Sequence, residues 1–125
     1  MDASQWRVVV IGVLYLLIFL FGVWLTRSGK PYSTIVLTIH KLISLAAAVY
    51  LGIVLYQMNK VAPLNAAEIA VGVTTGLLFL GTIATGGLLS VDRAMPSVVL
   101  WSHRITPFLT VIASAVTLYL VLGGR

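Results

Sequence analysis

Four long apolar stretches, separated by short polar breaks, make up most of the chain. They cover about residues 8–25, 33–58, 66–90 and 97–122. A bilayer core about 30 Å thick needs about 20 mostly apolar residues per spanning helix, and each stretch has about that length. The pattern predicts an all-α integral membrane protein, with one four-helix transmembrane domain over residues 1–125.

Charge, Gly and Pro mark the breaks between these stretches. Gly29 and Pro31 end the first helix, and Pro63 lies in the second break. Asn65, followed three residues later by Glu68, has the pattern of a capping box and starts the third helix. Breaks this short force neighbouring helices to run in opposite directions. We therefore expect an antiparallel up-down-up-down bundle in which the second and fourth helices are diagonal partners.

Composition narrows the classes of function. Of the 125 residues 60% are hydrophobic and 9% are charged, whereas a soluble domain carries about 25% charged residues. Any chemistry must therefore lie within the membrane or at its surfaces. Eight Lys and Arg stand against three Asp and Glu, but they are scattered over breaks and helix ends, which favours anionic lipid headgroups over nucleic acid as their partner. Cysteine is absent, which removes thiolate metal sites and iron–sulfur clusters.

Two histidines lie inside the apolar stretches, where an ionisable group is costly and usually functional. His40 and His103 each lie about seven residues, or roughly 10 Å, inside the start of their helices, so they share one depth. From diagonal helices, two imidazoles at one level can approach a common centre from opposite sides. This is the geometry of axial ligation to a flat iron porphyrin, which brings four nitrogens of its own. We therefore predict that the two histidines are the metal ligands of one noncovalent haem b.

Small residues near the histidines leave volume for a bulky planar group. Ala47 and Thr110 lie seven residues after the two histidines on the same helix faces, Gly22 lies near that level on the first helix, and Gly86 is one of five glycines we count in the third. We interpret these four as cofactor-binding positions, although close helix packing in lipid also uses glycine. Pro107 predicts a bend in the fourth helix at the same place.

Lys41 and Arg104 directly follow the two histidines. Their side chains should lean toward the membrane face where the second and fourth helices begin, and there meet the anionic haem propionates. Trp101 is the expected neighbour of the haem edge, although aromatic belts place tryptophans at such depths without further role. The second ring nitrogen of each metal ligand needs an acceptor, for which preceding-turn carbonyls or Thr82 and Thr85 are candidates.

The two halves of the chain resemble each other. Residues 35–42 match residues 98–105 at a constant shift of 63 positions (103 minus 40), and in both segments a histidine is followed by a basic residue. Apolar residues match easily by chance, so the histidine–basic pair is the informative part. The repeat suggests an ancestral duplication of one helical hairpin.

With His40–Lys41 and His103–Arg104 in this arrangement, the chain resembles the four-helix membrane b-type cytochromes. The resemblance covers the whole chain in architecture and rests on these two pairs. It implies one-electron transfer, with a quinone, superoxide or a redox protein as the partner. Members that pass electrons across the membrane commonly hold two haems with four histidines. This chain has two histidines in all, so we do not expect it to relay electrons across the membrane alone.

Other functions share part of this pattern, and no residue pattern identifies a catalytic group. A haem sensor or carrier without turnover would bind the same cofactor. A structural subunit of a membrane complex would need none, since a buried histidine is often a hydrogen-bonded packing residue, and a proton relay or another metal would also use the pair. A small proton-coupled exporter relies on a carboxylate in its first helix, which residues 8–25 lack.

Charge sets the expected orientation. The first and third breaks carry Arg27, Lys30 and Arg93, and the side chains of Lys41 and Arg104 lean toward the same face. With all five counted, the positive-inside rule places this face and the haem in the cytoplasm, and we expect a plasma membrane of prokaryotic type.

Overall fold

The computed structural model describes residues 1–91 and 93–123. It contains four helices, α1 (Ala3–Ser28), α2 (Thr34–Val61), α3 (Ala66–Leu89) and α4 (Ser97–Gly123). Each is long and apolar enough to cross a membrane. The predicted all-helical class with four helices of spanning length is confirmed.

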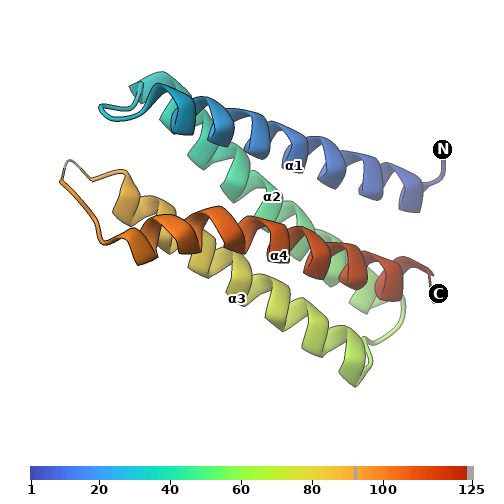
Figure 1. Ribbon diagram of the computed structural model, residues 1–125. Coiled ribbons are helices and arrows are strands. Elements are labelled where there is room, and N and C mark those ends of the chain that lie inside the picture. Colours follow the sequence, from blue (N-terminus) through green and yellow to red (C-terminus); the bar gives the residue numbers. More distant parts are fainter. Residues whose placement is uncertain (92, 124–125) are drawn as a thin grey trace.

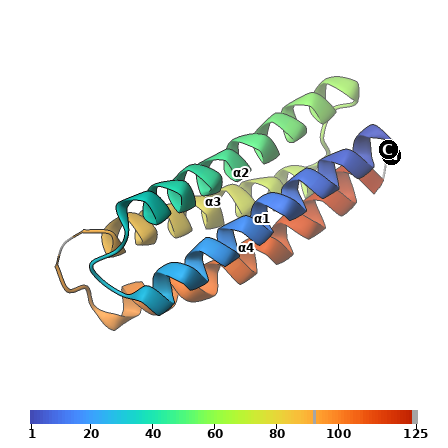
Figure 2. The same ribbon diagram turned by 90° about the horizontal axis from the view of Figure 1, so that it is seen from above.

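The helices are arranged as two hairpins. α1 packs closely along α2, and α3 along α4, whereas contacts between the two hairpins are sparse. Both termini and the connection between α2 and α3 lie at one end of the molecule, which we call the terminal end (Figures 1 and 2). The connections within the two hairpins lie at the opposite end, the hairpin end. The seam between the hairpins is therefore the least tightly packed part of the backbone framework.

Side-chain caps fix where helices begin. The Asn65 side chain accepts a hydrogen bond from the backbone N–H of Glu68 at 2.9 Å, and the Glu68 carboxylate accepts one from the backbone N–H of Asn65 at 3.1 Å. The predicted capping box of α3 is thus confirmed. The side chain of Ser33 caps α2 in a simpler way, by accepting from the backbone N–H of Val36.

α1 begins at Ala3, several residues before the apolar run that starts at Val8. Asp2 and Gln5 form a second capping box there, so a polar cap rather than the first apolar residue sets the start of the helix. α4 continues through Pro107 as one helix. The bend expected at this proline stays a prediction.

The most completely buried part of the interior lies toward the terminal end. One cluster of buried apolar side chains draws on all four helices and comprises Ile11, Ala47, Leu51, Val54, Met58, Phe79, Leu118 and Val121. Thr75 of α3 and Thr117 of α4 join their hydroxyls at 3.0 Å beside it. Because each hydroxyl also has the carbonyl four residues earlier on its own helix as an acceptor, the pair does not interrupt the apolar packing.

The interior toward the hairpin end is filled differently. Within the described residues, Leu25 and Val36 are the buried apolar side chains that lie outside that cluster. The two histidine rings lie in this half, against Gly22 and Gly86, and Thr82 and Thr85 contact one of them. The fold therefore combines an apolar half with a half that holds the histidine pair.

Candidate functional site at the histidine pair

His40 of α2 and His103 of α4 meet across the seam between the two hairpins. Their ring centroids are 6.4 Å apart, and the ring planes are inclined by 73°. If one nitrogen of each ring lay about 2 Å from a metal, as in protein–imidazole sites, and about 1 Å from its own ring centre, a linear arrangement would separate the centroids by about 6 Å. The observed separation therefore fits axial ligation of one metal by both rings.

The His103 ring is held by two acceptors on α3. Its Nδ1 lies 2.9 Å from the Thr82 carbonyl oxygen and 3.0 Å from the Thr85 hydroxyl oxygen. A carbonyl oxygen only accepts, so Nδ1 must carry the proton and Nε2 the lone pair. The Thr85 hydroxyl has its own acceptors in the backbone of α3, which leaves its oxygen free to accept from the ring. This tautomer, with Nδ1 donating to a carbonyl, is the one that metal-ligating histidines adopt.

The His40 ring lacks this support. Its Nδ1 is buried and has no hydrogen-bond partner within the part of the chain that the structure describes. The Ile18 carbonyl of α1 faces the nitrogen but does not meet hydrogen-bond geometry. A buried polar atom without a partner costs about 1–3 kcal/mol, and such atoms in native proteins generally have a function or an additional ligand.

Each imidazole lies against a glycine of the neighbouring helix in its own hairpin. A Cβ atom at Gly86 would lie 2.8 Å from Cε1 of His103, and one at Gly22 would lie 3.3 Å from Cε1 of His40. Any side chain at Gly86 would therefore displace the ring. The sequence pointed to both glycines as room for a cofactor, and the structure shows that the room is taken by the histidine rings.

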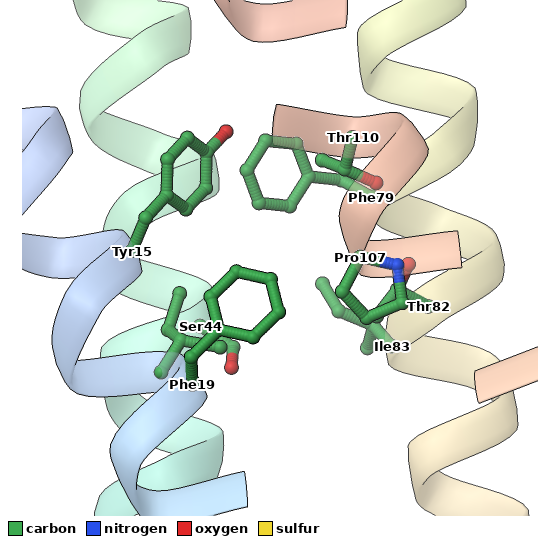
Figure 3. A pocket seen from close by; sticks show the side chains of 9 residues that line it. Tyr15, Phe19, Ser44, Phe79, Thr82, Ile83, Pro107 and Thr110 are labelled. Carbon is green, nitrogen blue, oxygen red and sulfur yellow. The ribbon is translucent and has the colours of Figure 1, made fainter. Parts of the chain in front are cut away.

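A small cavity lies between the four helices beside the pair (Figure 3). Its volume is about 30 Å³, enough for a group the size of one or two water molecules. Ser44 and Pro107, which line it, each come four residues after one of the histidines. The other lining residues are Tyr15, Ile18, Phe19, Phe79, Thr82, Ile83 and Thr110.

Two of the predicted cofactor-binding residues are basic and lie at the exposed surface of the hairpin end. Lys41 donates from Nζ to the Ser90 hydroxyl at 3.0 Å, which links α2 to the end of α3. The Arg104 guanidinium lies 5.4 Å from the centroid of the Trp101 ring, and that ring is 56% exposed. These three predicted residues therefore form an outer shell at one end of the bundle, away from the ring contact itself.

The other two predicted positions, Ala47 and Thr110, are both buried. Thr110 lines the cavity and donates its hydroxyl to the Thr106 carbonyl at 2.9 Å. Ala47 is fully buried, but it belongs to the apolar cluster of the terminal half. Of the two, Thr110 therefore lines the cavity beside the histidines, and Ala47 does not.

The sequence did not predict that the Ile18 carbonyl faces His40, or that the two glycines are in contact with the histidine rings. A sequence pattern could have identified them, because Ile18 and Thr82 each stand four residues before the glycine that touches a histidine. The pattern is hard to recognise, because the glycine precedes its histidine by 18 positions in the first hairpin and by 17 in the second. A fixed shift of 63 positions therefore does not align the two glycines.

Comparison with known protein families, curated proteins and solved structures finds no match for this chain. Its function must be inferred from its own residues. Among the described residues, no group of three or more His, Cys, Asp or Glu could hold a metal ion. A metal at the histidine pair would therefore need most of its ligands from a group other than the protein.

The glycine contacts predict opposite effects for two alanine substitutions on α3. Gly86→Ala should lower the free energy of unfolding in detergent, because displacing the His103 ring costs about 1–3 kcal/mol. Gly81→Ala is the matched control, since its Cβ would meet open space, and it should leave stability unchanged or raise it by up to about 1 kcal/mol through helix propensity. Equal effects of the two substitutions would show that the imidazole does not lie against Gly86.

Proposed function

We propose that this chain is a membrane b-type cytochrome, with four membrane-spanning helices, one noncovalent haem b on His40 and His103, and one-electron transfer as its activity. The observation that carries the proposal is the meeting of two imidazoles from different hairpins in the bundle interior, with 6.4 Å between ring centroids.

The outward faces support membrane insertion. Every helix exposes large apolar side chains, for example Leu16, Leu45, Leu77 and Ile112, each more than half exposed. Soluble monomers rarely expose continuous apolar surface of this extent, whereas a bilayer favours it. Helices also satisfy their own backbone hydrogen bonds, which lipid requires. With short connections, the helices would cross the membrane in alternating directions.

The residues present fit a haem. Two imidazoles supply the axial positions, and a porphyrin supplies the four nitrogens that the protein lacks. The Nδ1-protonated tautomer of His103 would leave Nε2 to bind the iron, and in His40 the Ile18 carbonyl faces Nδ1, so Nε2 would be the binding atom there as well. The cavity of about 30 Å³ is too small for a porphyrin, so binding requires the side chains between the helices to rearrange while the two rings keep about their present separation.

Bound haem would supply a reversible one-electron iron couple. The protein would fix the imidazoles through Thr82, Thr85 and the glycine contacts, and keep water from the interior with the apolar cluster of the terminal half. With His40 and His103 both holding the haem, an electron partner would approach from the exposed hairpin end. Lys41 and Arg104 at the exposed end would attract an anionic partner such as superoxide or an acidic redox protein, or hold a quinone headgroup there.

A structural role is the second candidate. The hydrogen bonds from His103 to Thr82 and Thr85 satisfy that ring without any metal, as in a histidine that only packs. The meeting of two imidazoles from different hairpins favours the cytochrome. A haem sensor or carrier would share the ligands and differ only in lacking an electron partner.

Absorption spectra separate haem binding from the structural role. Detergent-purified protein reconstituted with hemin should show the Soret and α bands of a six-coordinate low-spin haem, and His40→Ala and His103→Ala should each lose the low-spin spectrum because one axial ligand is gone. Ser102→Ala, beside the site on α4, is the control and should keep it. A wild-type protein that stays colourless after reconstitution, with its helices intact by circular dichroism, would leave only the structural role.

The anchoring of His103 predicts a positioning role for Thr85. Thr85→Val removes one acceptor from Nδ1 and should weaken hemin affinity by about tenfold, the lower end for such outer partners, and raise the midpoint potential because the ring becomes a poorer donor. Thr82→Val is the matched control, since the Thr82 hydroxyl bonds the Leu78 carbonyl and the ring uses only the Thr82 backbone. Identical potentials in both variants would remove the assignment.

Orientation follows from the basic hairpin end. We propose that this end faces the cytoplasm of a prokaryotic plasma membrane. The chain has no cysteine, so single Ala62→Cys and Ala94→Cys variants report on opposite ends, and both positions are exposed. In intact cells a membrane-impermeant maleimide should label Ala62→Cys, and label Ala94→Cys only after permeabilisation. The reverse pattern would invert the orientation.

A further inference from the structure

A second hollow, separate from the cavity beside the histidines, runs between α1 and α4. It extends from Tyr15 and Ser114 near the middle of the bundle to the two termini, and its volume is about 740 Å³, within the range of ligand sites. α1 and α4 contact each other sparsely, so the groove is open along the side of the molecule. Its walls are mostly apolar and include Val8, Ile11, Gly12, Val111 and Leu118.

The inner end of the groove carries a hydroxyl pair with one proton to spare. The Tyr15 and Ser114 hydroxyls bond each other across α1 and α4. Two hydroxyls bring two protons, and one hydrogen bond uses one of them. Within the described residues neither hydroxyl makes another hydrogen bond, although Ser114 is only 1% exposed. Whichever hydroxyl donates to the other, one donor remains at the inner end of an apolar groove.

Other hydroxyls of the same helix behave differently. Thr106, Thr110 and Thr117 each donate to the carbonyl four residues earlier, which satisfies their proton within α4. Ser114 instead reaches across to α1. A buried donor without an acceptor is costly, so the pair favours a ligand that brings an acceptor into the groove.

Depth restricts what that ligand is. Tyr15 follows the first residue of α1 by 12 positions (15 minus 3), or about 18 Å at the rise of an α-helix. In a hydrocarbon core about 30 Å thick this lies near the bilayer centre. The ester carbonyls of phospholipids belong to the headgroup region, so they do not reach the pair. An acceptor at this depth belongs to a neutral molecule that dissolves in the hydrocarbon core.

We propose that the groove between α1 and α4 binds a neutral, bilayer-soluble molecule with an alkyl tail and a terminal carbonyl. The carbonyl oxygen accepts the spare proton of the Tyr15–Ser114 pair, and the tail lies along the apolar walls toward the termini. The inference rests on the membrane insertion proposed above and is independent of haem at the histidines.

Binding of 2-dodecanone, with dodecane as the reference, tests the hydrogen bond. Calorimetry on the full chain in lipid nanodiscs should show tighter binding of the ketone than of the alkane. The double variant Tyr15→Phe, Ser114→Ala should bind the ketone about three- to tenfold more weakly, the equivalent of one hydrogen bond, with dodecane binding unchanged. Equal ketone affinity in the variant and the wild type would overturn the proposal.

Filling the groove tests the location without touching the hydroxyls. Gly12 lines the groove and a Cβ there meets open space, whereas Gly52 is equally open but lies outside the groove. Gly12→Leu should abolish saturable ketone binding and Gly52→Leu should preserve it. Loss in both, or in neither, would mean that the ketone binds elsewhere or only partitions into lipid.

The haem spectrum of the same samples separates this inference from the proposed function. A colourless protein that binds the ketone in the groove would refute the cytochrome and leave the groove site standing. A low-spin haem spectrum together with ketone affinity that is unchanged by the Tyr15, Ser114 and Gly12 substitutions would refute the groove site alone.

Discussion

The contact between His40 and His103 is the interaction on which the interpretation of this molecule depends. It joins the two hairpins at a place where their backbones pack sparsely, and it brings together two ionisable rings inside an otherwise apolar protein. Such groups are expensive in lipid unless they have partners. One ring has its hydrogen bonds and the other has a buried nitrogen without one. One ring is therefore fixed by hydrogen bonds to α3, whereas the other faces the Ile18 carbonyl of α1 without hydrogen-bond geometry.

The two hairpins solve the same packing problem in the same way. In each, the second helix carries a histidine whose ring lies against a glycine of the first helix, Gly22 in one hairpin and Gly86 in the other. The absence of a Cβ lets the ring lie close to the helix backbone, where a carbonyl one turn earlier faces Nδ1. Only the second hairpin adds Thr85 as a further acceptor. The repeat in the sequence thus corresponds to a repeated contact, with a difference that makes the two histidines chemically unequal.

Packing is divided along the length of the bundle. The terminal half is held by an apolar cluster from all four helices and by the Thr75–Thr117 pair. The hairpin half is held by polar links between the hairpins, such as Lys41 to Ser90 and Lys30 to the carbonyls of Val91 and Arg93. Hydrogen bonds at an exposed end are individually weak, so the hairpins are joined less firmly in the hairpin half than in the terminal half.

The lengths of the apolar runs, the polar breaks and the caps determined the four helices, because a long helix needs only a run of suitable residues and local signals at its ends. Asn65 and Glu68, for example, form the capping box of α3 that their spacing predicts. The start of α1 differed, since the cap at Asp2 precedes the apolar run. The sequence also predicted that the two histidines lie at one level, because each stands about seven residues after the start of its helix. Only the tertiary structure decided that the rings meet, that they lie against Gly22 and Gly86, and that a groove lies between α1 and α4. These depend on helix rotation and on contacts between distant residues, which no local pattern encodes.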